Sequence, residues 1–156
     1  MNDRDYLEQA VDLAVENVRS GNGGPFGAIL LRDRAILSRG TDLVTETNDP
    51  KAHAEIIAIR KACQELETFE LDRSVLYTSC EPCPICLGAI LWSRIGRVVF
   101  VADRRDAAGA GSNDEEHYRQ YLPDIKAKMV QMDQILLESA NRAFKVWTEA
   151  RHLPRY

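Results

Sequence analysis

Apolar residues recur every three or four positions near the start of the chain, over residues 3–19. The apolar positions are Leu7, Ala10, Val11, Ala14 and Val18, and charged side chains fall mostly on the opposite side. This spacing places an apolar stripe along one face of an α-helix. The glycine-rich run 21–25, which ends in proline, is expected to end that helix.

Short β-rich runs bounded by turn residues predict strands further along the chain. They cover 27–31, 35–39, 74–79 and 98–102, with a weaker edge strand over 128–132. Helical patterns cover 52–66, 84–93, 116–121 and 139–151, while 41–50 and 103–114 are expected to be loops. The polar residues 32–34 suit a tight hairpin between the first two strands. Strands alternating with helices predict an α/β fold, a three-layer α-β-α sandwich with a mixed central sheet of about five strands.

Composition narrows the class of protein. The chain has 156 residues, 45% of them hydrophobic and 28% charged, which is ordinary for one globular domain over 1–156. Its net charge of −4 argues against a dedicated nucleic-acid binder, which usually carries a basic surface. No apolar run approaches the roughly 18 residues of a membrane span. The charged N-terminal residues do not resemble a signal peptide, so a cytoplasmic location is expected.

Candidate chemistry lies in the cysteines. Three of the four, Cys80, Cys83 and Cys86, fall close together, which in a reducing compartment indicates a metal or catalytic site. Cys83 and Cys86 are spaced to face one point at a helix start, and His53 opens a second helix. One imidazole and two thiolates suit zinc with a fourth position open for water. A structural zinc with Cys80 as fourth ligand, or a redox Cys-x-x-Cys pair, is the alternative.

Glu55 follows His53 by two positions, where a carboxylate can take a proton from the attacking water and return it to a leaving group. The combination of His-x-Glu with Pro-Cys-x-x-Cys, here His53 to Glu55 and Pro82 to Cys86, is the signature of zinc nucleobase deaminases. Glu55 is therefore the predicted catalytic residue.

The sequence resembles the cytidine deaminase superfamily, and within it the small bacterial guanine deaminases. The resemblance rests on GGPFGA at 23–28, TNDPKAHAEIIAIRKAC at 47–63, LYTSCEPCPICLGAI at 76–90, DAAGAG at 106–111 and the terminal tyrosine. It implies a cytidine deaminase-like fold, one Zn²⁺ per chain and hydrolysis of a free aminopurine base, with guanine converted to xanthine and ammonia. It also implies a homodimer, in which the C-terminal segment of one protomer can cross to its partner.

The resemblance also implies a set of substrate-binding residues: Phe26, Asp42, Ala54, Trp92, Asp114 and Tyr156. Phe26 would stack near the base and Trp92 would form a pocket wall, although both positions equally suit the core. Asp114 would recognise the purine, against the alternative of a solvated loop acid. Tyr156 would close over the base, whereas a chain end is ordinarily disordered.

Asp42 departs from the family pattern, which has an asparagine at this position. Asparagine donates and accepts hydrogen bonds, while an ionised aspartate only accepts. Guanine O6 and N7 are acceptors, so an ionised Asp42 would repel them. Three possibilities remain: Asp42 is protonated, it meets a ring N–H, or the substrate is a related ring such as isoguanine, 8-oxoguanine or an amino-triazine.

Three further functions remain as alternatives on the sequence alone. A tRNA wobble-adenosine deaminase has the same zinc core but needs basic residues for phosphate, and those of this chain are scattered. A cytosine deaminase and a non-catalytic zinc module are the other two. A small-molecule nucleobase, with no nucleic acid and no membrane, is the expected partner.

Overall fold

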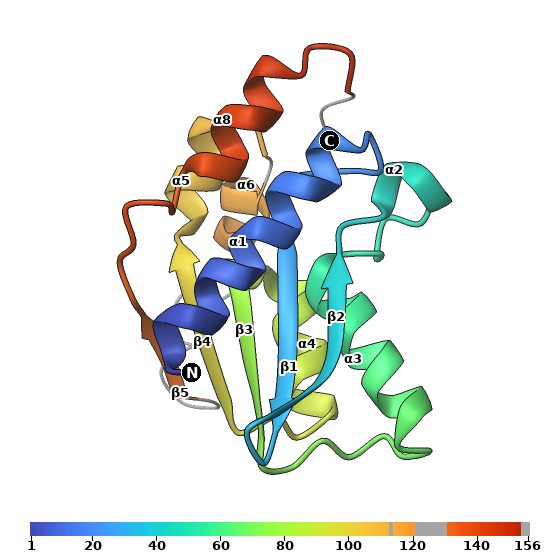
Figure 1. The fold of residues 1–156 in the computed structure, drawn as a ribbon. Helices are drawn as coiled ribbons and strands as arrows, with labels where there is room; N and C mark the ends of the chain where they lie inside the picture. Colours follow the sequence, from blue (N-terminus) through green and yellow to red (C-terminus); the bar gives the residue numbers. More distant parts are fainter. Residues whose placement is uncertain (113, 121–130, 154–156) are drawn as a thin grey trace.

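The computed structural model describes residues 1–112, 114–120 and 131–153. Its centre is a five-stranded sheet in the order β2-β1-β3-β4-β5 (Figure 1). The strands are β1 (Gly27–Arg32), β2 (Ala35–Thr41), β3 (Ser74–Cys80), β4 (Arg97–Ala102) and β5 (Gln131–Gln134). β1 runs antiparallel to β2 and β3, whereas β3, β4 and β5 run parallel. The predicted mixed sheet is confirmed.

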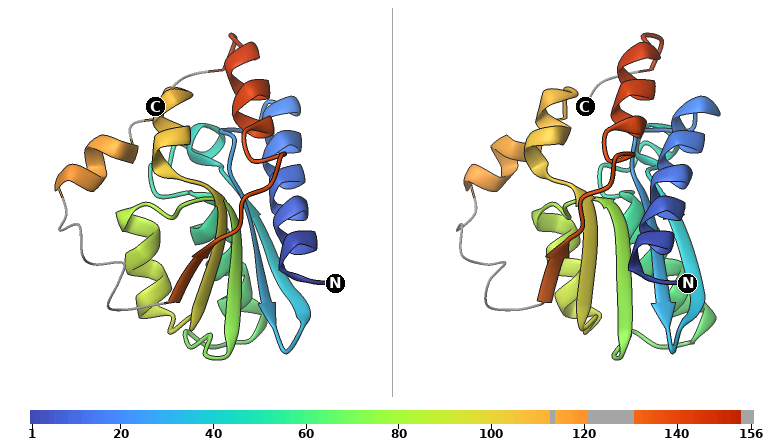
Figure 2. Two further views of the ribbon diagram at one scale, coloured as in Figure 1. Left: turned by 90° about the vertical axis from the view of Figure 1, so that its left-hand side faces the viewer. Right: turned by 60° about the vertical axis from the view of Figure 1, so that its left-hand side comes forward.

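Helices cover both faces of this sheet, as the two views of Figure 2 show. α1 (Asp3–Arg19) and α8 (Arg142–Glu149) lie on one face, and α3 (Ala54–Glu65) and α4 (Pro84–Trp92) on the other. α5 (Arg104–Gly109) and α6 (Asp114–Gln120) follow the carboxyl end of β4, and the short α2 (Val44–Thr47) follows β2. Within the described ranges, no helix combines the length and apolar composition that a membrane span requires.

The predicted helix over 3–19 is confirmed, and its start has a defined cap. The Asn2 side chain accepts hydrogen bonds from the backbone N–H groups of Arg4 and Asp5, while the Asp5 carboxylate accepts from the backbone of Asn2. This reciprocal capping box satisfies N–H groups that have no partner inside the helix. The predicted hairpin is also present, since β1 and β2 pair up to Arg32 and Ala35. Its turn residues Asp33 and Arg34 have positive φ values of 51° and 67°, as a two-residue type I′ turn requires.

The layer that holds α3 and α4 is built from small and branched apolar side chains. Ala28 and Leu30 of β1 pack in one buried cluster with Ala54 and Ala58 of α3 and Ile90 of α4. Gly40 of β2 lets α3 approach the sheet closely, since a Cβ there would lie 2.1 Å from the Ala54 carbonyl oxygen. This packing holds the first residues of α3 beside the ends of β2 and β3.

The structure corrects several predicted boundaries. Segments 41–50 and 103–114 were expected to be loops, but they contain α2 and α5. Asp103 is the N-cap residue of α5 and forms a capping box with Asp106. This local cap outweighs the loop-like composition. The edge strand runs over 131–134 rather than 128–132, and residues 128–130 lie outside the described part. The last helix covers 142–149, shorter at both ends than expected.

Candidate active site

Two helix starts meet at the end of the sheet where β2 and β3 finish. His53 is the N-cap residue of α3 and Cys83 is the N-cap residue of α4, with Cys86 one turn further on. Neither His53 nor Cys83 uses its side chain to cap its own helix. The side chains face each other instead, and the positive ends of both helices favour thiolates between them.

The spacing of the three ligand atoms is that of a tetrahedral metal site. Sγ of Cys83 lies 3.7 Å from Sγ of Cys86 and 3.4 Å from Nδ1 of His53, and the Cys86 Sγ to His53 Nδ1 distance is 3.5 Å. In a tetrahedral zinc site with bonds of about 2.3 Å to sulfur and 2.0 Å to nitrogen, the sulfurs lie about 3.8 Å apart and each sulfur about 3.5 Å from the nitrogen. The two sulfurs are too far apart for a disulfide, whose bond is about 2.05 Å. The three side chains therefore fit zinc.

The two other cysteines stand apart from this group. Sγ of Cys80 lies 3.7 Å from the Asp103 carbonyl oxygen, and Cys63 is half-buried on α3. Across residues 1–112, 114–120 and 131–153, the side chains that can share one ion are His53, Cys83 and Cys86. A zinc site with three protein ligands leaves one position open, as catalytic sites do. The alternative of a closed structural site with Cys80 has no support in this geometry.

The three ligand side chains shift one another's pKa values. The hydrogen bond with Cys86, with His53 contributing further, lowers the pKa of Cys83 to about 4. Burial opposes protonation of His53, but the hydrogen bond and charge of Cys83 outweigh it and raise the pKa of His53 to about 9. The hydrogen bond with Cys83, followed by burial, raises the pKa of Cys86. Because zinc binds the neutral imidazole and the thiolate, metal binding displaces the protons of His53 and Cys86.

Glu55 lies beside the ligand group without belonging to it. Its Oε2 is 3.4 Å from Sγ of Cys86, and its Oε1 accepts a hydrogen bond of 2.9 Å from the Thr78 hydroxyl. The side chain is buried, and this burial, followed by the charge of Cys83, raises the pKa of Glu55 to about 7. A carboxyl group with a pKa near neutrality can both accept and release a proton during one reaction cycle.

Of the residues expected to bind substrate, Ala54 and Asp42 lie near the ligand His53, and the backbone of Phe26 is bonded to that of Asp42. Ala54 is completely buried at the first position of α3. Asp42 is 1% exposed, its Oδ1 accepts hydrogen bonds of 3.3 Å from the backbone N–H groups of Gly24 and Val44, and its charge acts on His53. Phe26 is half-buried, with its ring edge-on to Phe144 at 5.9 Å. Phe26 thus packs against the core and still keeps an exposed surface.

The other three expected residues are not brought to this centre within the described part. Trp92, at the far end of α4 from the cysteines, is 84% exposed, so it is neither a core residue nor a pocket wall inside one chain. The sequence does not show which side of α4 faces the sheet, so the exposure of Trp92 could not be predicted from it. Asp114 is the first residue of α6, but its side chain lies outside the described part, as does all of Tyr156.

Two site-related residues escaped the sequence analysis. Thr78, which holds Glu55, is a completely buried polar residue in β3. Asn17 is a 3% exposed polar residue of α1. The sequence contained a sign of each. Asn17 continues the apolar stripe of its helix three positions after Ala14, and Thr78 lies in a strand whose composition indicates burial. A polar residue at such a position needs a buried hydrogen-bond partner.

Comparison with known proteins agrees with this geometry. The family model described as "Cytidine and deoxycytidylate deaminase zinc-binding region" matches residues 1–102. Guanine deaminase of Bacillus subtilis is 44% identical over 156 residues, which cover all of both chains. An X-ray structure of guanine deaminase from Bacillus subtilis covers the whole of this chain and 98% of that one, with a TM-score of 0.75 and 43% identity.

A second branch of relatives acts on RNA. The tRNA-specific adenosine deaminase of Haemophilus influenzae is 40% identical over 111 residues, or 70% of this chain and 64% of that protein. Both branches share the deaminase core and the zinc chemistry, so the predicted fold class and the predicted zinc-dependent nucleobase deaminase activity are confirmed. The chain belongs to the cytidine and deoxycytidylate deaminase zinc-binding family.

Proposed function

We propose that this protein deaminates a free aminopurine base by hydrolysis, with guanine as the leading substrate and xanthine and ammonia as products. The observation that carries the proposal is the match to a guanine deaminase along the full length of both chains. The match to the tRNA-specific enzyme, by contrast, covers 70% of this chain. We further propose that the whole of 1–156 acts as one deaminase domain.

The proposed chemistry assigns separate roles to the ligands and to Glu55. When bound by His53, Cys83 and Cys86, zinc supplies Lewis acidity that brings the pKa of a coordinated water to about 7. The Glu55 carboxylate takes a proton from the attacking water and gives it to the departing amino group, which leaves as ammonia. Thr78 keeps one oxygen of Glu55 in place through its hydrogen bond, so the other oxygen faces the centre.

Substrate recognition is proposed for Phe26, Asp42, Ala54, Asp114 and Tyr156. Phe26 offers a ring face for stacking, and the backbone of Ala54 lies next to the ligand His53. Asp114 and Tyr156 take their roles from the family resemblance. Trp92 is exposed on its own chain. Its proposed contribution to substrate binding is therefore made in a dimer, at the contact with the partner protomer.

Asp42 decides which base fits best. An ionised carboxylate accepts hydrogen bonds and repels the acceptors of guanine, O6 and N7. Two backbone N–H groups bond its Oδ1 and hold the carboxyl group in place. If Asp42 is ionised, bases that present a ring N–H to it are favoured over rings that present only acceptors there.

A panel of free bases tests the proposal. Ammonia release is measured for guanine, isoguanine, 8-oxoguanine, adenine, cytosine and ammeline, with guanosine as the control that carries ribose. Turnover of at least one free aminopurine, and none of guanosine, is expected. Turnover of cytosine alone, or of none of the bases, would overturn the proposal.

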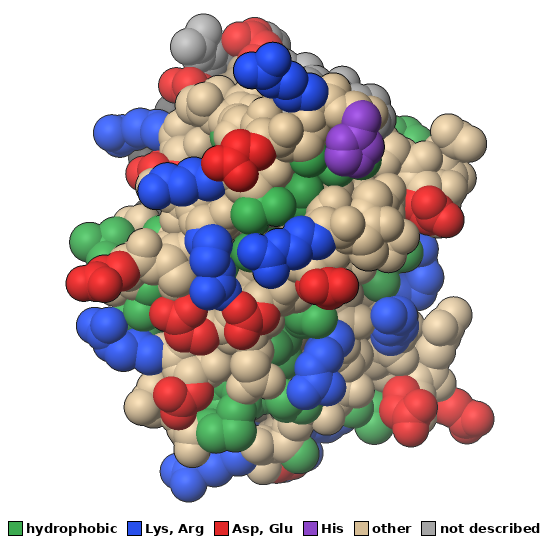
Figure 3. All heavy atoms as spheres, turned by 45° about the horizontal axis from the view of Figure 1, so that its top comes forward, with side chains coloured by type: hydrophobic (Ala, Val, Ile, Leu, Met, Phe, Trp, Pro, Cys, Tyr) green, Lys and Arg blue, Asp and Glu red, His purple; other side chains and the backbone are tan. Residues whose placement is uncertain are grey.

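The tRNA-specific relatives make wobble-adenosine deamination the second candidate. RNA binding needs a field of Lys and Arg side chains, whereas acidic and basic side chains are interspersed over the end of the molecule drawn in Figure 3. Incubation with a tRNA anticodon stem-loop tests this function, and inosine formation would favour it over the purine reaction.

A homodimer is proposed on the exposed face of α4. Ile85 and Trp92 are 48% and 84% exposed, and α4 contains no charged residue. A Cβ on Gly88, between them, would meet nothing, so a second copy can approach the helix closely. This dimer needs no exchange of C-terminal segments, because α8 lies beside its own α1 (Figure 1), where Ala143 joins the buried cluster of α1. A cytoplasmic location is proposed because the four cysteines are free and none is joined in a disulfide.

A further inference from the structure

One buried amide on α1 holds together two loops of the proposed pocket. Asn17 lies near the C-terminal end of α1 and is 3% exposed. Its Nδ2 donates hydrogen bonds of 2.9 Å to the Gly24 carbonyl oxygen and 2.8 Å to the Asp42 carbonyl oxygen. Gly24 and Asp42 belong to loops far apart in the sequence. A single side chain therefore links the two loops.

The two loops also bond to each other around this amide. The Asp42 N–H donates to the Phe26 carbonyl oxygen at 3.2 Å, and the Gly24 N–H donates to the Asp42 carboxylate at 3.3 Å. The loops approach so closely that a Cβ on Gly23 would lie 2.3 Å from the Asp42 carbonyl oxygen. These contacts set where Phe26 and Asp42 lie relative to each other.

We propose that Asn17 is a positioning residue of the substrate pocket, which acts through the Gly24 and Asp42 carbonyls to place the side chains of Phe26 and Asp42. Asn17 itself touches neither substrate nor metal. The inference rests on the proposed function, which assigns Phe26 and Asp42 to substrate binding.

The zinc ligands are held mainly by the packing of their own helices. His53 and Cys83 begin α3 and α4, which pack on the opposite face of the sheet from α1 (Figure 2). Loss of the Asn17 amide should therefore loosen the two loops and leave the metal centre intact. The positioning role therefore predicts a raised KM with an unchanged zinc content.

The test compares Asn17→Ala with a matched variant that loses the same kind of bond elsewhere. Gln134 of β5 donates from its side-chain amide to the Val101 carbonyl oxygen at 2.9 Å, so Gln134→Ala is the control. Zinc content, unfolding temperature, kcat and KM are measured for the best free-base substrate of the panel. Asn17→Ala should raise KM roughly five- to tenfold, with kcat within about twofold and zinc unchanged. Gln134→Ala should leave KM unchanged.

A double-mutant cycle connects Asn17 to its target. If Asn17 acts by placing Asp42, the rise in KM caused by Asn17→Ala should largely disappear in an Asp42→Ala background. Additive effects, or an Asn17→Ala enzyme that loses only stability, would overturn the inference. Should Asn17→Ala fail to fold, Asn17→Ser replaces it, because a hydroxyl can donate to only one of the two carbonyls. A raised KM then supports the role, and an unchanged KM refutes it.

The same measurements separate the two proposals. If Phe26→Ala and Asp42→Ala leave KM unchanged, the assignment of the substrate pocket fails, and the role of Asn17 fails with it. If those two variants raise KM but Asn17→Ala does not, the pocket assignment stands and only the positioning role is wrong.

Discussion

At the scale of single residues, the structure keeps the Glu55 carboxyl group close to two cysteines, Cys83 and Cys86. Glu55 is 6% exposed, and an isolated buried charge is unfavourable. The hydrogen bond from Thr78 and the neighbouring His53 favour its charged form, while burial and Cys83 oppose it. These opposing effects leave a group that changes its protonation readily.

Replacing Glu55 by glutamine should remove turnover and keep the metal. Glutamine has nearly the same shape but cannot shuttle a proton, so kcat should fall about 10²- to 10⁴-fold. Zinc per chain and kcat are measured together, with Glu8→Gln as control, because Glu8 bonds Ser139 away from the site. Near-wild-type turnover in Glu55→Gln would contradict the shuttle role.

The two classes of cysteine should respond differently to substitution. Cys83→Ala removes one of three ligands and should lose most of the zinc and some thermal stability, because metal binding contributes to folding. Cys63→Ala removes a half-buried thiol on α3 and should retain zinc. Elemental analysis of the purified variants measures the metal, and full occupancy in Cys83→Ala would rule out its assignment as a ligand.

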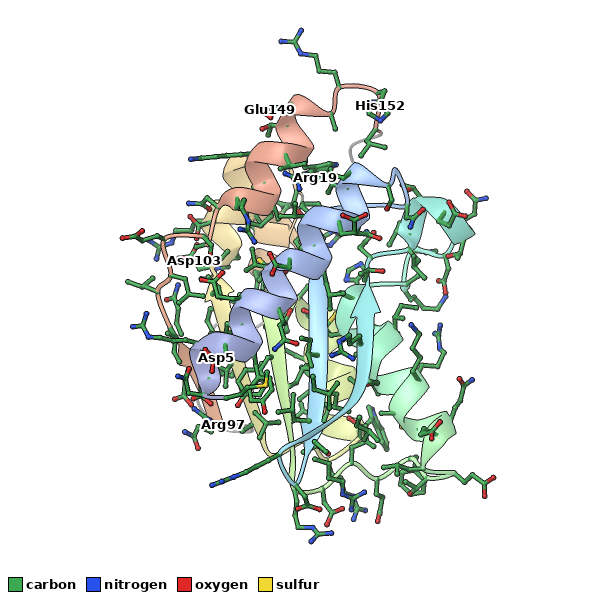
Figure 4. All side chains as sticks on the ribbon, in the orientation of Figure 1. Asp5, Arg19, Arg97, Asp103, Glu149 and His152 are labelled. Carbon is green, nitrogen blue, oxygen red and sulfur yellow. The ribbon has the colours of Figure 1, made fainter. Side chains whose placement is uncertain are left out.

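At the scale of elements, a cluster of charged and polar side chains joins four elements at the end of the sheet away from the site. Figure 4 shows Arg97 near the N-terminal end of α1, at the opposite end of the molecule from His152. Arg97 of β4 pairs at 2.9 Å with Asp3 of α1 and at 2.9 Å with Asp133 of β5. The Tyr77 hydroxyl also donates to Asp3 at 2.7 Å. The cluster fastens the edge strand and the first helix to the sheet.

This cluster predicts a loss of stability in acid. The hydrogen bond from Arg97 holds the pKa of Asp3 below its usual value, despite partial burial. A lowered folded-state pKa stabilises the fold above the unfolded pKa of about 3.9, and this contribution is lost as the pH falls through the folded value. The unfolding temperature should fall more steeply below about pH 4 in the wild type than in Asp3→Asn.

The control for the acid experiment is Asp33→Asn, in the hairpin turn, where asparagine accepts a positive φ. Asp33→Asn should follow the wild-type curve through the same pH range. If Asp3→Asn also follows that curve, the ion pair contributes nothing to stability in acid.

At the scale of the whole molecule, the outer face of α4 is where a second copy is proposed to bind. Trp92→Glu places a charge on this apolar face and should shift a dimer towards monomer, because burying an unpaired charge is costly. Leu136→Glu is the matched control, since Leu136 is 73% exposed on a different segment. Sedimentation measures the mass of both variants. A Trp92→Glu protein that remains as associated as the wild type would exclude this face as the interface.

The sequence by itself determined the chemistry and most of the elements. His53, Cys83 and Cys86, which the structure brings together, were predicted as ligands from residue type and short spacing, because metal ligation demands particular atoms and a helix start brings neighbours together. Glu55 was predicted as the proton shuttle from its spacing to His53. Local periodicity likewise predicted α1, α3, α4 and the four long strands. Information of this kind lies within a few residues of each position, so it can be read without the fold.

Only the tertiary structure decided what depends on contacts between distant segments. The Thr78 bond to Glu55 joins β3 to α3, and the Asn17 bonds join α1 to two loops. The exposure of Trp92 depends on which side of α4 packs on the sheet. Burial and hydrogen-bond partners are properties of such packing, because a buried polar group is stable only where another part of the chain supplies its partner.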